Sequence, residues 1–187
     1  MPWIANYGEA YVEQMTLGTP PAADLAADPA AKPAAESGGD AATGPVVCIS
    51  ITEPGRVARL PKGFAAVLRL GFQDYDGHRK HPDSAVLFDA RMAAQLVRFA
   101  RKHRGSNIVV HCAAGISRSG AVVEALLEAF REYEDHGWPR YPNGHVKTIL
   151  KRALGLVPIG WEEPVRYESP GEDTITEKVN LEPEDGQ

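Results

Sequence analysis

The sequence predicts an α/β fold, with a central, mostly parallel sheet flanked by helices. Short apolar runs rich in β-branched residues alternate with longer segments of helical periodicity, and Gly or Pro separates them. Strands that alternate with helices in this way form parallel sheets covered on both faces. The 187 residues suffice for one domain with its own core and are too few for two domains of ordinary size.

Three strands and three helices account for the middle of the chain. We expect strands at 46–51 (VVCISI), 67–72 (VLRLGF) and 107–111 (NIVVH). We expect helices at 85–103 and 119–134, whose apolar residues recur at helical spacing. A third helix is expected to begin after Asn143 as its N-cap and to end at Gly155.

The remaining segments differ in composition from this body. Residues 1–18 hold enough large apolar side chains to supply a strand and helix of the core. Residues 19–45 contain ten Ala, five Pro and three Gly, which predicts a flexible insert or linker. Residues 161–187 are acidic and interrupted by Pro, so we expect a disordered tail. The body of the domain is therefore assigned to 46–160.

Charge is unevenly distributed along the chain. The formal net charge is −5, yet residues 46–160 carry 17 bases and 10 acids. A basic body suggests an anionic substrate, although a solvated surface between acidic ends explains the same numbers. No basic run suggests nucleic-acid binding. No segment reaches the roughly 18–20 apolar residues of a membrane helix, and no signal peptide is evident, so we expect a cytoplasmic protein without a membrane partner.

The stretch HCAAGISRSG at 111–120 joins a predicted strand to a predicted helix. In parallel sheets, ligands bind at the carboxyl ends of strands and at helix N-termini. The small residues after Cys112 allow successive backbone N–H groups to surround an anion, and Arg118 would add a planar pair of donors. The same donors would favour a Cys112 thiolate placed for in-line attack on phosphorus.

This stretch has the form His-Cys-x-x-Gly-x-x-Arg-Ser and resembles the signature loop of the cysteine-dependent protein tyrosine and dual-specificity phosphatases. The similarity extends over about 46–160 in element order and is closest to the compact bacterial or phage-like forms. It implies a phosphatase domain that needs no cofactor or metal. One departure from the family is Gly120, where many dual-specificity members carry Ser or Thr.

The resemblance also assigns roles to the loop residues. It implies that Cys112 is the nucleophile, that Arg118 holds the phosphate, and that Ser119 assists departure of the thiolate. His111 would support the loop and the thiolate. The backbone of the loop would bind the substrate phosphate through Ala113, Ala114, Gly115, Ile116 and Ser117.

The general acid is the least defined of these residues. The family supplies it from an Asp on a loop that follows an earlier strand, and GFQDYDGHRKHPD offers three candidates. Asp74 follows the strand 67–72 directly and is the first choice. Asp76 would serve if the loop is longer, and Asp83 has a second role available as N-cap of the helix 85–103.

Two cysteines do not make a disulfide framework. Cys48 lies in an apolar strand and is expected to pack in the core, with a reversible disulfide to Cys112 as the alternative. The histidines lack the spacing of metal ligands.

These residues predict a phosphatase that acts on phosphotyrosine in a phosphorylated protein substrate; activity on phosphoserine or phosphothreonine stays open. The alternatives are the same chemistry on a phosphoinositide, nucleotide or RNA 5′ end, and a phosphate-binding module without turnover. A rhodanese-like sulfurtransferase also uses a cysteine loop but fits His111 and Arg118 less well. The oligomeric state is not predicted.

Overall fold

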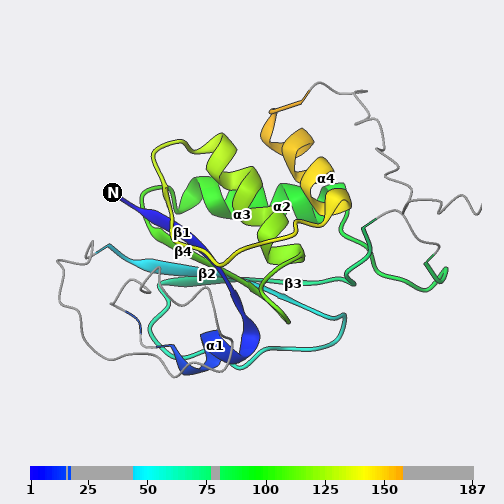
Figure 1. Ribbon diagram of the computed structural model, residues 1–187, viewed down its shortest axis with the longest axis horizontal. Coiled ribbons are helices and arrows are strands. Elements are labelled where there is room, and N and C mark those ends of the chain that lie inside the picture. The colour runs from blue at the N-terminus through cyan, green and yellow to red at the C-terminus, as the bar shows by residue number, and fades with distance from the viewer. Residues whose placement is uncertain (16, 18–43, 77–80, 158–187) are drawn as a thin grey trace, which may run out of the picture.

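The strands form one five-stranded sheet in which every neighbouring pair is parallel, which confirms the α/β class (Figure 1). The computed structural model describes residues 1–15, 17, 44–76 and 81–157. The predicted tail at 161–187 and almost all of the predicted insert at 19–45 lie outside these residues. The elements, in chain order, are β1 (Trp3–Gly8), α1 (Glu9–Gln14), β2 (Val46–Thr52), β3 (Ala66–Gly71), α2 (Ala90–Lys102), β4 (Asn107–Cys112), α3 (Arg118–Ala129), β5 (Glu134–Asp135) and α4 (Gly144–Leu154).

The first strand of the chain lies inside the sheet. The strand order is β3-β2-β4-β1-β5, so β1 pairs with β4 on one side and with the short β5 on the other. All six residues of β1 and of β4 are buried. Strands buried on both faces need apolar side chains in both directions, which explains the continuous apolar run of β4.

Helices cover the two faces of the sheet unequally. The helices α2, α3 and α4 pack on one face, and the short α1 lies on the other (Figure 1). The larger core lies under the three helices, where α2 contributes Ala93, Leu96, Val97 and Ala100. The smaller core lies under α1 and contains Cys48, Val109 and the apolar residues of β1.

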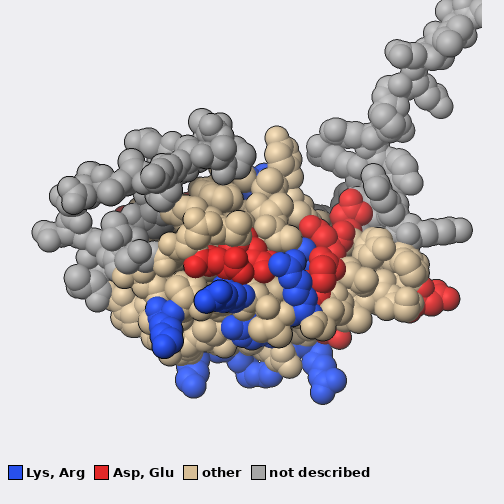
Figure 2. All heavy atoms as spheres, turned by 90° about the horizontal axis from the view of Figure 1, so that it is seen from below, with Lys and Arg blue, Asp and Glu red and all other residues tan. Residues whose placement is uncertain are grey.

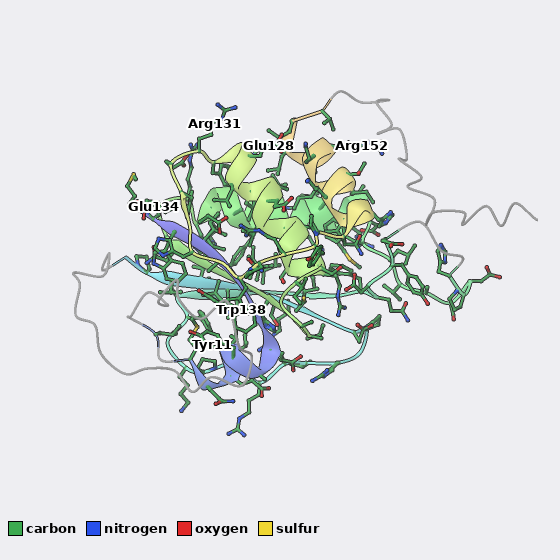
Figure 3. All side chains as sticks on the ribbon, in the orientation of Figure 1. Tyr11, Glu128, Arg131, Glu134, Trp138 and Arg152 are labelled. Carbon is green, nitrogen blue, oxygen red and sulfur yellow. The ribbon has the colours of Figure 1, made fainter. Side chains whose placement is uncertain are left out.

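Aromatic side chains close the smaller core. The ring of Tyr7 lies 4.8 Å from the ring of Tyr11 and 5.6 Å from that of Trp138, between ring centroids. Trp138 and Tyr11 meet edge to face at 5.3 Å, next to α1 in Figure 3. Contacts of this kind add to the burial of apolar surface, so the segment after β5 fixes α1 against the sheet.

Two helix limits differ clearly from the sequence prediction. The helix predicted at 85–103 begins at Ala90, and its N-cap is Asp89, whose side chain accepts from the Met92 N–H at 2.8 Å. The N-cap role offered for Asp83 is therefore wrong. The helix predicted at 119–134 ends at Ala129 because the chain turns at Phe130, whose N–H still bonds to Leu126. The helix after Asn143 begins and ends as predicted, with Gly155 left-handed at its C-cap.

Candidate active site

Cys112 is the last residue of β4 and lies at the carboxyl edge of the sheet. The loop 113–117 follows it, and α3 begins at Arg118. The strand, loop and helix therefore occur in the predicted order. Cys112 is only 2% exposed, whereas Ala113, Ala114 and Ile116 are exposed on the loop above it.

Two hydrogen-bonding groups surround the Cys112 sulfur. The Gly115 N–H donates to Cys112 Sγ at 3.3 Å, and Ser119 Oγ lies 3.2 Å from the same sulfur. Ser119 is fully buried in the first turn of α3. Donors aimed at a buried sulfur stabilise negative charge on it, as does the N-terminus of a helix. This arrangement suits a thiolate nucleophile.

Gly115 shapes the loop against the end of β1. Its φ is +77°, and a Cβ placed there would lie 2.3 Å from the backbone nitrogen of Gly8 and from the carbonyl carbon of Tyr7. The Gly115 carbonyl accepts from Asn6 Nδ2 at 2.6 Å. The first strand of the chain is therefore part of the support of the loop.

Asn6 is itself held by a second residue. Arg140 Nη1 donates to Asn6 Oδ1 at 2.9 Å, and Arg140 also pairs with Asp135. A Cβ on Gly120 would lie 2.8 Å from the Cβ of Arg140. The glycine that departs from the family pattern is thus required by the close packing of Arg140 on α3.

Arg118 is buried, and two carboxylates lie close to its guanidinium group. Its side chain is 4% exposed, and Nη1 donates to the Phe72 carbonyl at 2.6 Å and lies 2.8 Å from Glu53 Oε1. Its Nε lies 3.6 Å from Asp74 Oδ2, which is too long for a hydrogen bond. Arg118 Nε is buried and has no hydrogen-bond acceptor among the described residues. An oxyanion above Cys112 would supply that acceptor.

Asp74 is joined to the loop by hydrogen bonds. Its Oδ1 accepts from Ser117 Oγ at 2.8 Å and from Asn143 Nδ2 at 2.7 Å. The structure thus brings Asp74, the first choice for the acid, beside Arg118. All three candidates, Asp74, Asp76 and Asp83, are exposed, so the bonds of Asp74 to Ser117 and Asn143 and not its burial distinguish it.

His111 lies behind the loop, on the α1 face of the sheet. It is fully buried, and its Nε2 lies 2.8 Å from Ser50 Oγ on β2. Burial, together with the positive charge of Arg69, lowers the pKa of His111 to about 4, although the adjacent Cys112 backbone acts in the opposite direction. His111 is therefore neutral at pH 7, and its ring contacts Ser50 on the neighbouring strand.

Cys48 is placed where it cannot pair with Cys112. It packs in the smaller core, Cys112 belongs to the larger one, and both thiols are free. Cys48 lies opposite Val109, three residues before Cys112, which is about 10 Å along the strand. A disulfide needs Cα atoms less than about 7 Å apart, so the alternative of a Cys48–Cys112 disulfide is wrong. Burial raises the pKa of Cys48 to about 12.

Sequence reasoning missed three residues of this site. Glu53 follows the predicted strand 46–51 in the sequence, but no chemical role was predicted for it. Ligands bind at the carboxyl ends of parallel strands, so the position of Glu53 could have indicated a site residue. Asn143 was predicted only as a helix cap, and nothing local indicates its bond to Asp74. Asn6 is a polar residue within a buried strand, and such residues require a partner.

Several findings bear on what else the chain binds. Among the described residues, no group of three or more His, Cys, Asp or Glu side chains is arranged to hold a metal ion. The longest described helix, α2, has 13 residues, and the described helices include none with the length and apolarity to cross a bilayer.

Comparison of the chain with protein-family models, with curated proteins and with solved structures gives no match.

Proposed function

We propose that this chain is a cysteine-dependent phosphatase with a protein-tyrosine-phosphatase-like fold, and that it hydrolyses phosphotyrosine in protein substrates. The observation that carries the proposal is the environment of Cys112: a buried thiol with the Gly115 N–H and the Ser119 hydroxyl on its sulfur. Arg118 Nε, which is buried and has no acceptor among the described residues, supports binding of an anion by this side chain. Activity on phosphoserine and phosphothreonine stays open.

In the first step, the Cys112 thiolate attacks phosphorus and forms an S–P bond while the bond to the leaving oxygen breaks. The loop N–H groups and the Nε edge of Arg118 bind the equatorial oxygens, whose charge they stabilise. Arg118 keeps its orientation because Nη1 is already bonded to the Phe72 carbonyl and Glu53.

Asp74 supplies the proton that the leaving oxygen needs. Ser117 and Asn143 both donate to Oδ1, which leaves Oδ2 to carry the proton. Loss of that proton to the departing phenoxide completes the first step.

In the second step, a water attacks the phosphorus of the cysteinyl phosphate, and the S–P bond breaks. The Asp74 carboxylate accepts the water proton, which regenerates the acid. Ser119 donates a hydrogen bond to the departing thiolate and keeps its proton, and phosphate is released. The cycle uses only residues of this chain and water.

Hydrolysis of aryl phosphates by the wild type, Cys112→Ser and Asp74→Asn tests the proposal. We expect no turnover for Cys112→Ser. We expect Asp74→Asn to lower kcat by about 10²- to 10³-fold for a poor leaving group and by much less for a good one, since only the poor one needs the proton.

Asp76→Asn and Asp83→Asn are the matched controls, and both should retain the wild-type rate. A rate loss in Asp76→Asn together with an unchanged Asp74→Asn would reassign the acid. Absence of any Cys112-dependent turnover, with phosphate still bound, would indicate a binding module instead of an enzyme.

A further inference from the structure

A cavity of about 260 Å³ opens at the carboxyl ends of β2 and β3. Its polar lining includes Ser50, Thr52, Arg56 and Arg69. Ser50 and Arg69 are register partners, and the next residue along β3, Leu70, packs in the larger core on the opposite face. Side chains alternate along a strand, so Ser50 and Arg69 point to the α1 face.

Two guanidinium groups are held in place around this cavity. Arg56 Nη2 lies 2.8 Å from Glu9 Oε1, and Arg69 Nη1 donates to the Ala58 carbonyl at 3.0 Å. Each guanidinium group has five N–H donors. In the part of the chain that the structure describes, the other donors of both arginines have no hydrogen-bond acceptor.

The charges around the cavity do not balance among the described residues. The Glu9 carboxylate balances one of the two arginines, and Arg69 has no carboxylate in ion-pair contact in the described ranges. Figure 2, which views the molecule from the α1 side, shows basic side chains beside acidic ones on this face. Among the described residues, the cavity therefore has one positive charge that no carboxylate balances.

We infer that this cavity binds a small phosphate-bearing anion, either inorganic phosphate or a phosphomonoester, between Arg56 and Arg69. Planar guanidinium groups match the oxygens of phosphate and bind them in pairs. The anchoring contacts with Glu9 and Ala58 restrict both side chains before the anion arrives, which reduces the entropy lost on binding. The inference does not depend on the chemistry proposed for Cys112.

The cavity is joined to the loop through one row of residues across the sheet. Arg69 lies opposite Ser50, and Ser50 lies opposite His111, the residue before Cys112. The Arg69 charge contributes to the lowered pKa of His111. An anion on Arg69 offsets that charge, so the His111 pKa should rise when the cavity is occupied.

A titration of the full chain with inorganic phosphate, followed by amide NMR, tests the inference. The amides of Gly55 and Val57, which line the cavity, report on the cavity, and that of Gly115 reports on the loop, so the two sites give separate Kd values. We expect saturable shifts at Gly55 and Val57. Arg69→Gln should weaken this binding about tenfold or more, because a charge-assisted hydrogen bond is lost, and should leave the Kd read at Gly115 unchanged.

Arg59→Gln is the matched control, since Arg59 is exposed on the same segment and does not line the cavity. It removes the same charge and should leave both Kd values unchanged. Arg56→Gln provides a second variant should Arg69→Gln fail to fold. No saturable shift at Gly55 and Val57, or an equal loss in Arg59→Gln, would overturn the inference.

A parallel titration with phenyl phosphate identifies the form of the ligand. Tighter binding of the ester assigns the cavity to a phosphomonoester, and tighter binding of the free ion assigns it to inorganic phosphate. Both results support the site. Because the cavity amides are read directly, a failure of turnover at Cys112 does not affect the outcome.

Discussion

Gly115 is the loop residue at which the structure leaves no room for a side chain. It combines a positive φ with direct contact against the backbone of β1. We predict that Gly115→Ala abolishes aryl phosphate hydrolysis and lowers the free energy of unfolding by more than the ~1–2 kcal/mol of left-handed strain alone. The loop must move away from Gly8 to accommodate the methyl group, and the Gly115 N–H then leaves the Cys112 sulfur. Urea denaturation and steady-state kinetics measure both effects.

Gly155→Ala is the control for Gly115→Ala, because it introduces left-handed backbone strain without a steric contact. Gly155 has φ +79°, and nothing lies within 4 Å of an added Cβ. This variant should lose only about 1–2 kcal/mol and keep full activity. Equal losses of stability in the two variants would contradict the role given to the contact with β1.

At the scale of elements, Asn143 joins the start of α4 to the candidate active site. Its Oδ1 caps the helix by accepting from the Val146 N–H, while its Nδ2 donates to Asp74. We predict that Asn143→Ser keeps the cap of α4, because Ser is an equally good N-cap, and lowers kcat for poor leaving groups, because Ser has no Nδ2 to donate to Asp74. Thermal unfolding and a series of aryl phosphates with different leaving groups check the two halves of this prediction.

Asp89→Ala is the control for capping alone. Asp89 caps α2 through the Met92 N–H. Its replacement should cost about 1 kcal/mol of stability without affecting kcat. If Asn143→Ser retained the wild-type rate for every leaving group, the bond to Asp74 would have no catalytic role.

At the scale of the whole molecule, the buried His111 makes stability depend on pH. Its pKa is about 4 in the folded protein and about 6.5 in the unfolded chain. The unfolded state therefore binds more protons between these values, and stability rises with pH across this window. We predict that about 3 kcal/mol of stability, present above pH 6.5, is lost as the pH falls to 4.

Urea denaturation at a series of pH values measures this slope. His111→Gln should flatten it, whereas His103→Gln, at the half-buried C-cap of α2, should leave it as in the wild type. A slope that is the same in wild type and His111→Gln would assign the pH dependence to other groups.

Features that depend on neighbouring residues in the sequence could be predicted, and features that depend on contacts between distant residues could not. The run 107–111 was identified as a strand because burial on both faces leaves an apolar signature in the residues themselves. The position of β1 between β4 and β5 has no such signature, since strand order depends on contacts distant in sequence. In the same way, Asn143 was found as a cap from its neighbours, but its bond to Asp74 joins residues 69 positions apart. Glu53 was missed because its partner, Arg118, lies on another element.

The inner position of β1 also has a consequence for how the protein is made. Trp3 bonds to Asn107, which lies 104 residues later, so β1 leaves the ribosome long before its partner strand exists. At about 5–20 residues per second, that delay is roughly 5–20 s. Throughout it, a strand that is wholly buried in the finished protein is exposed as an apolar segment. The contacts of Asn6 and Gly8 with the loop can form only after this interval, so the loop acquires its support late in synthesis.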